Sequence, residues 1–210
     1  MANEALDRWL RELWERVAWR CPEFEVVLPG AASFVCQAAG CPAHCCKVFT
    51  IVPLGEREVV RLSRASGLQP LELVECEDGE PLTHRALPAA RPYFLARHDG
   101  VCRFLGRDLL CVQHEGRPDA CRVYPYYVFF FDTLAGLPVR AGLDDMATAI
   151  GGLCGWQRPP AGAVLAPLLL RHAECPGLTG PPLGREEWLN LVGETFRLQY
   201  GEPLEHGERP

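Results

Sequence analysis

The chain has 210 residues, a net charge of −6 and 48% hydrophobic residues, the balance of an ordinary globular protein. The negative charge does not favour a nucleic-acid partner, and no apolar run approaches the roughly eighteen residues that a membrane span needs. The charged segment 1–20 lacks the apolar region of a signal peptide, so we expect a cytoplasmic protein, and the single lysine, Lys47, is typical of a GC-rich bacterial genome.

The first predicted element is an amphipathic helix over residues 3–20. Its apolar side chains recur at the helical spacing of three and four residues, and they are Leu6, Trp9, Leu10, Leu13, Trp14 and Val17. We expect this face to dock on the core. The alternative is a contact surface for a protein partner, formed around Trp9 and Trp14.

The next elements are short. Residues 48–52 predict a strand that Pro53 ends, and residues 55–65 predict a helix that Gly67 closes. Residues 70–76 predict a further short helix with proline in its first turn. A strand-rich section then runs over 93–96, 101–105 and 109–112, with an Asp-Gly turn signal at 99–100. This meander is expected to bring Cys102 near Cys111.

The last third mixes helices and one aromatic strand. Residues 117–122 predict one helical turn, and residues 126–131 predict a core strand rich in aromatic side chains. The pattern over 143–172 is ambiguous, and we interpret 144–150 and 164–172 as helical. A helix over 185–200 and a polar tail over 201–210 complete the chain.

Cysteine is the most unusual residue of the chain. There are 11 cysteines, and two of them, Cys45 and Cys46, are adjacent. A reducing cytoplasm, an odd count and a vicinal pair all disfavour a disulfide framework, which leaves metal binding as the preferred explanation. The chain has no C-x2-C knuckle, so a zinc ribbon or finger is not favoured.

Eight of the cysteines lie in turn-rich segments that could converge on metal. They are Cys36, Cys41, Cys45, Cys46, Cys102, Cys111, Cys121 and Cys175. Eight thiolates are too many for one tetrahedral ion, and they suit two zinc ions, one iron–sulfur cluster with spare ligands, or two metal centres. Nearby cations would compensate the negative thiolates, and the candidates are Lys47, Arg103, Arg117 and Arg122.

The segments C-R-F-L at 102–105 and C-V-Q-H-E-G-R-P-D-A-C-R-V-Y-P at 111–125, with C-P-G at 175–177, resemble the YkgJ-type cysteine-cluster family. That family is described as zinc- or iron-chelating, and the flagellin lysine N-methylases carry a similar domain. The resemblance implies that the eight cysteines are the ligands. It departs at the first loop, which is more widely spaced than C-x2-C-x2-C-C, and at His114, where the family has tyrosine.

Three cysteines fall outside the resemblance. We interpret Cys21, Cys76 and Cys154 as small buried apolar side chains, with Cys154 the first substitute ligand. His44 and His114 lie beside ligand cysteines and are interpreted as neighbours of the site, not as ligands.

The sequence therefore predicts a small, loop-rich α+β protein, with a single cysteine-cluster domain over 1–200 and its metal-binding region at 36–180. Short antiparallel strands and flanking helices would surround a metal-centred cysteine cluster. We expect an iron–sulfur cluster, preferably 4Fe–4S, with zinc as the alternative metal. Two other functions stay open: a methyltransferase-like enzyme acting on protein lysine, and a structural zinc interaction module.

Overall fold

The structure is a computed structural model, and it describes residues 2–37, 40–49, 51–83, 90–154 and 165–201. The chain forms two compact units. We call Met1–Val35 with Pro125–Pro210 the sheet unit and Cys36–Tyr124 the cysteine unit. Each is described by itself, and the single domain expected over 1–200 stays a prediction. The predicted tail lies outside the described residues, except for Gly201.

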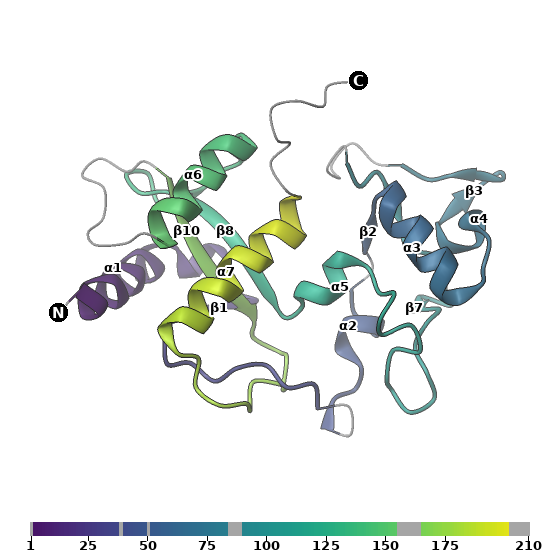
Figure 1. Cartoon of the computed structure of the whole chain (residues 1–210), viewed down its shortest axis with the longest axis horizontal. Coiled ribbons are helices and arrows are strands. Elements are labelled where there is room, and N and C mark those ends of the chain that lie inside the picture. The colour runs from purple at the N-terminus through teal and green to yellow at the C-terminus, as the bar shows by residue number, and fades with distance from the viewer. Residues whose placement is uncertain (1, 38–39, 50, 84–89, 155–164, 202–210) are drawn as a thin grey trace. The chain divides into compact units, whose positions relative to one another are not determined.

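The sheet unit is built on a four-stranded antiparallel sheet (Figure 1). The strand order is β1 (Phe24–Val26), β10 (Leu165–His172), β8 (Tyr126–Asp132) and β9 (Leu137–Pro138). Along β8, the buried Tyr126, Val128 and Phe130 alternate with the half-buried Tyr127 and Phe129, and Phe131 beyond them is also fully buried. The aromatic strand expected at 126–131 is thus a core strand.

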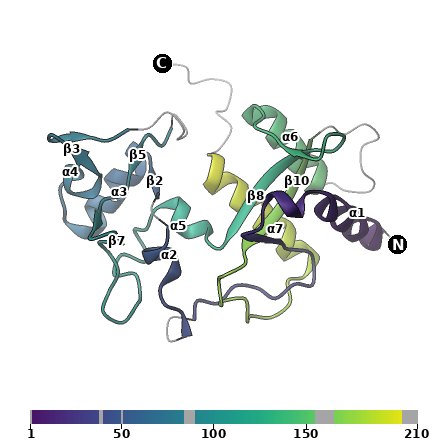
Figure 2. The same ribbon diagram turned by 180° about the vertical axis from the view of Figure 1, so that it is seen from behind.

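Helices bury their apolar sides against this sheet. They are α1 (Ala2–Val17), followed by the 3-10 turn η1 (Ala18–Arg20), α6 (Leu143–Cys154) and α7 (Arg185–Tyr200). Helix α7 crosses in front of β8 and β10 in Figure 1 and lies behind them in Figure 2, so it covers one face of the sheet. The fully buried Trp188 of α7 donates its indole N–H to the carbonyl of Val27 at 2.8 Å.

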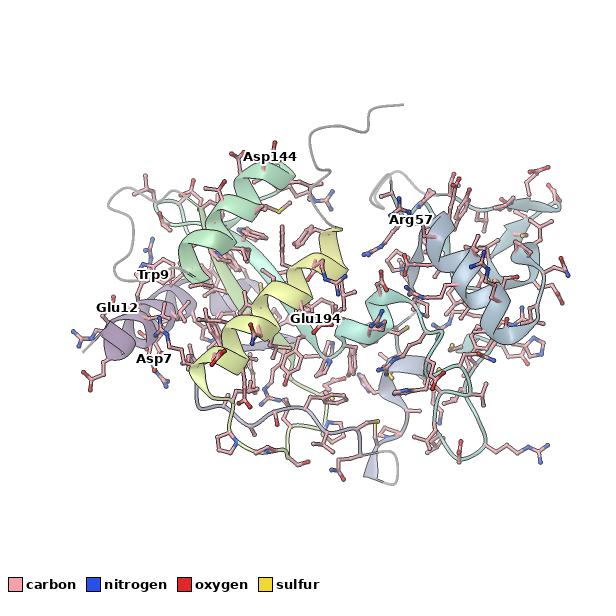
Figure 3. All side chains as sticks on the ribbon, in the orientation of Figure 1. Asp7, Trp9, Glu12, Arg57, Asp144 and Glu194 are labelled. Atoms are coloured by element: carbon pink, nitrogen blue, oxygen red, sulfur yellow. The ribbon has the colours of Figure 1, made fainter. Side chains whose placement is uncertain are left out.

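The same core takes up the apolar face of α1. Leu6, Leu10 and Val17 are completely buried. Exposed carboxylates come from the other sides of the helices, as Glu12, Asp144 and Glu194 show in Figure 3. The helical spacing therefore identified the residues by which α1 docks on its unit.

The cysteine unit has short helices and two-stranded antiparallel ladders. Its helices are α2 (His44–Lys47), α3 (Glu56–Ser66), α4 (Pro70–Leu73) and α5 (Asp119–Val123). Its ladders pair β2 (Pro53–Leu54) with β5 (Tyr93–Phe94), β3 (Cys76–Glu77) with β4 (Glu80–Pro81), and β6 (Arg97–His98) with β7 (Val101–Cys102). A small core of its own forms around Leu54, Leu62 and Leu73, all fully buried. Together with the sheet unit, this confirms the α+β class with short antiparallel strands.

Two sequence-based elements were wrong in type. Two more were wrong in extent, since the helix expected over 70–76 ends at Leu73, and of the strand expected over 109–112 only the bridge at Cys111 forms. Residues 164–172 were expected to be helical, but Leu165–His172 is strand β10. An uninterrupted apolar run has no period that separates a buried strand from a buried helix. Pro167 is tolerated in this strand because the pairing of β10 with β1 reaches only Leu170–His172, so at Pro167 β10 pairs with β8 alone.

The second error concerns residues 48–52, where a strand was expected. Pairing begins only afterwards, at Pro53–Leu54 of β2. Val48 still belongs to the turn of α2, because its N–H donates to the carbonyl of His44 at 2.8 Å, and the carbonyl of Phe49 accepts from the side chain of Arg97. Val48 and Phe49 are therefore not in a strand.

Candidate metal centre

The vicinal cysteines lie on the four-residue helix α2. Ala43 opens the helix in the left-handed region, with a φ of 59°. In a helical turn successive side chains point about 100° apart instead of to opposite sides, as they would in a strand. The sulfur atoms of Cys45 and Cys46 accordingly lie 3.9 Å apart. Helix α2 thus presents two thiols toward the same region.

A tight hairpin brings the next cysteine to this pair. Asp99 and Gly100 connect β6 to β7 with φ values of 50° and 75°, the left-handed pair that a two-residue hairpin turn requires. Cys102 on β7 stands opposite Arg97 on β6. Helix α2 lies against β7, so the segments that carry Cys46 and Cys102 are neighbours, and the two thiols influence each other electrostatically.

Cys111 reaches the same region through the predicted meander. Leu105 and Cys111 form an isolated antiparallel bridge. Val112 donates its N–H to the carbonyl of Phe104 at 2.9 Å, and Gly106 donates to Leu110 at 2.8 Å. Leu105, which forms the bridge to Cys111, also donates its N–H to the carbonyl of Cys102 at 3.0 Å, so the turn places Cys111 near Cys102 as predicted.

Cys121 lies on α5, whose start is fixed by a charged network. Asp119, the first residue of α5, forms ion pairs with Arg61 at 2.7 Å and with Arg91 at 3.2 Å. Its N–H donates to the carboxylate of Glu58 at 2.8 Å. Glu58 is 5% exposed, and it also pairs with Arg91 at 3.0 Å.

This network orients the segment that carries Cys121. Arg61 also donates to the carbonyl of Arg117 at 3.0 Å, just before Pro118. Helix α3 therefore holds both the loop before α5 and the first turn of α5. A five-residue helix is too short to be stable by itself, so these contacts determine where Cys121 points.

The thiols influence one another strongly. Interaction with the Cys46 thiol is the main cause that lowers the pKa of both Cys45 and Cys102, and Arg97 and Arg103 lower that of Cys102 further. Interaction with Cys102 and Cys45 raises the pKa of Cys46.

Burial raises the pKa of the other two thiols of the group, Cys111 and Cys121. Desolvation raises the pKa of Cys121, and the neighbouring thiolates Cys102, Cys45 and Cys111 raise it further. Desolvation is also the main cause of the raised pKa of Cys111. Arg117 acts in the opposite direction on both. The five thiols of this group therefore influence one another's ionisation, and a bound cation would favour their deprotonated form.

The structure thus brings five of the eight predicted ligands together, and they are Cys45, Cys46, Cys102, Cys111 and Cys121. We call this group the thiolate cluster. Cys36 is exposed and Cys41 half-buried on the segment that leads into α2. Cys175 is buried in the sheet unit. The ligand roles of these three stay predictions.

The cysteines that were not predicted to be ligands differ in their burial. Cys21 is buried, as expected, but Cys76 is exposed, because it lies in the β3–β4 ladder, where its thiol hydrogen-bonds backbone carbonyls. The side chain of Cys154 lies outside the described residues. Half-buried His44 is in edge-on contact with Phe49, and His114 is exposed. None of the ten cysteines whose side chains are described forms a disulfide.

Several residues that shape the site were missed on sequence grounds. Arg97, Glu58, Arg61, Arg91 and Asp119 were not singled out, because charged residues on short elements are ordinarily solvated. Of these, Asp119 had a detectable signal, since it lies inside the R-P-x-x-C-R segment. Of the predicted cations, Arg103 and Arg117 influence the thiolates, whereas Arg122 lies 3.7 Å from Asp119.

The spacing of the sulfur atoms can be compared with the needs of a metal. A tetrahedral zinc ion with bonds of about 2.3 Å requires sulfur atoms roughly 3.8 Å apart, and the pair Cys45–Cys46 fits this at 3.9 Å. Across the described part of the chain, however, no three cysteine sulfur atoms lie within 4.8 Å of one another. The soft thiolate donors suit zinc or iron, and the wider spacing leaves room for more than one metal atom.

Comparison with known proteins agrees with this donor set. A family model described as "CxxCxxCC: Putative zinc- or iron-chelating domain" matches residues 35–141, just over half of the chain. The chain belongs to this family, as the resemblance predicted. The match contains all five members of the thiolate cluster and ends before Cys175. No curated protein and no solved structure matches the chain. Of the helices described, none has the length and apolar character needed to cross a bilayer.

Proposed function

We propose that the cysteine unit binds an iron–sulfur cluster through Cys45, Cys46, Cys102, Cys111 and Cys121. The carrying observation is that five thiols from four short elements, namely α2, β7, the bridge at Cys111 and α5, lie in one region of the cysteine unit. More than four candidate ligands and the absence of knuckle spacing in the sequence favour a polynuclear centre over one closed zinc site. A bound cluster of this kind would supply electron transfer or stabilise the fold.

The metal would also complete the cysteine unit. Helix α2, the β6–β7 ladder and α5 are each two to five residues long. Elements this short gain little from their own hydrogen bonds, so ligand bonds among them would contribute directly to folding. Because thiolate ligands require a reducing compartment, we place the protein in the cytoplasm as part of this proposal.

Zinc is the second candidate, and the Cys45–Cys46 separation favours it. A structural zinc site would fix the same segments without electron transfer. The two candidates differ in colour, metal and sulfide. An iron–sulfur protein is brown and contains acid-labile sulfide, whereas a zinc protein is colourless and contains none.

The test is anaerobic purification of the full chain with absorption spectroscopy, elemental analysis and sulfide analysis. We expect iron and sulfide in the native protein. Single Cys45→Ser, Cys111→Ser and Cys121→Ser variants should lose metal and solubility together, and Cys76→Ser is the matched control because Cys76 is exposed in a separate ladder. Metal content unchanged in all three variants contradicts the assignment, and stoichiometric zinc without sulfide decides for the alternative.

A further inference from the structure

Arg97 connects two ligand-bearing segments of the cysteine unit through its side chain. Its guanidinium donates to the carbonyl of Cys46 at 2.9 Å and to the carbonyl of Phe49. The same group donates to the carbonyl of Gly100, from Nε at 2.9 Å and from Nη2 at 2.7 Å. Its own N–H donates to the carboxylate of Glu75 at 2.8 Å. One side chain thus binds the end of α2 and the turn of the β6–β7 hairpin.

At α2, Arg97 donates to a backbone carbonyl that has no hydrogen-bond partner within the helix. The last carbonyls of a helix have no partner within it, and in a four-residue helix such as α2 they form a large share of the backbone. A cation near these carbonyls also favours the helix dipole. Arg97 therefore stabilises the short turn on which Cys45 and Cys46 lie.

The contacts at the hairpin place the third thiol. Arg97 and Cys102 face each other across the β6–β7 ladder, so the backbone of Arg97 and the position of Cys102 are linked by strand pairing. The guanidinium also donates twice to the carbonyl of Gly100 in the connecting turn. One arginine side chain is therefore bonded to both the segment that carries Cys46 and the hairpin that carries Cys102.

We propose that Arg97 is a positioning residue of the thiolate cluster, which sets the separation of Cys46 and Cys102 and thereby prepares these thiolates for the metal. This inference rests on the proposed function for its metal-binding part. Arginine suits the task because its planar group offers several fixed donors to carbonyls on two segments, whereas a lysine ammonium is a single point on a flexible stem.

The first measurement concerns geometry and needs no metal. In the reduced, metal-free full chain, the short bifunctional reagent dibromobimane alkylates two neighbouring thiols with loss of two bromide ions. Peptide mapping by mass spectrometry then quantifies the Cys46–Cys102 product. We expect its yield to fall several-fold in Arg97→Gln and Arg97→Lys. The control is Arg57→Gln, because Arg57 is an exposed arginine of the same unit, labelled in Figure 3.

The second measurement concerns affinity. Cobalt(II) serves as the probe, because its thiolate absorption reports binding, and a competing chelator gives the affinity. Loss of a partner that orients metal ligands typically weakens binding by about 10–100-fold, and we expect at least the lower value for both Arg97 variants. Far-UV circular dichroism checks that each variant is folded, and if Arg97→Gln is not folded, Arg97→Lys decides.

Each outcome has one meaning. Unchanged Cys46–Cys102 yield in the folded Arg97 variants overturns the proposal, even where cobalt affinity falls. Reduced yield with reduced affinity supports it. If the native chain binds no metal at all, the proposed function fails, but the cross-linking yield still decides whether Arg97 sets the thiol separation.

Discussion

Truncating the buried Glu58 to alanine is expected to destabilise the cysteine unit strongly, although Glu58 is not itself a metal-ligand candidate. The Glu58 carboxylate is almost fully buried, and it accepts N–H groups from Gly55 at 3.0 Å and from Asp119 at 2.8 Å. It also pairs with Arg91 at 3.0 Å. The variant therefore leaves two amides without their acceptor and one buried guanidinium without one of its carboxylates.

The magnitude follows from these three contacts. Removing one partner of a buried ion pair costs about 3–5 kcal/mol. Arg91 keeps its second carboxylate, Asp119 at 3.2 Å, so the lower end applies. We expect Glu58→Ala to reduce the free energy of unfolding of this unit by about 3 kcal/mol. Glu56→Ala is the matched control, because Glu56 is exposed in the same first helical turn, and about 0.5 kcal/mol or less is expected there.

The assay must report on the correct unit. All five tryptophans (Trp9, Trp14, Trp19, Trp156 and Trp188) belong to the sheet unit, so tryptophan fluorescence does not follow the cysteine unit. Native-state hydrogen exchange measured by mass spectrometry follows the cysteine unit through peptides that cover α3 and α5. A loss of 3 kcal/mol predicts roughly 100-fold faster exchange of the protected amides in these peptides. Equal exchange in Glu58→Ala and Glu56→Ala refutes the reasoning.

Two further predictions concern packing and thiol chemistry. Gly177→Ala should destabilise the sheet unit by about 1–3 kcal/mol, because an added Cβ would lie 2.5 Å from the ring of Phe34. In the control Gly193→Ala, in α7, the added Cβ meets nothing within 4 Å, so this variant should be neutral or stabilising by about 0.5–1 kcal/mol. Urea titrations followed by tryptophan fluorescence compare the two variants, and equal unfolding midpoints contradict the predicted clash with Phe34. In metal-free protein, Cys45 and Cys102 should react with iodoacetamide before Cys46 and Cys121. Interaction with the Cys46 thiol lowers the pKa of Cys45 and Cys102, while the pKa of Cys46 and of Cys121 is raised. A thiol with a lowered pKa stays deprotonated at neutral pH and is protonated only as the pH falls further, so Cys45 and Cys102 should still react at a pH where ordinary thiols no longer do. Peptide mapping that finds Cys121 alkylated first would contradict this prediction.

Local patterns in the sequence determined a large part of the fold. The helical spacing of Leu6, Leu10 and Val17 predicted the buried face of α1, and the bounds of α7 agree with the predicted 185–200. The Asp99-Gly100 turn and the meander before Cys111 followed from turn chemistry, which depends on residues next to each other in the chain. The cysteine spacing, with the R-P-x-x-C-R segment, was sufficient to identify the family.

Only the tertiary structure decided the rest. Leu165–His172 is a strand because β1 and β8 pair with it, a long-range contact that its apolar run does not encode. Likewise, the roles of Arg97, Glu58 and Asp119 depend on segments distant in sequence that meet around them. A buried charge is stable only where such partners are supplied, and a sequence read along the chain shows the charge without showing its partners.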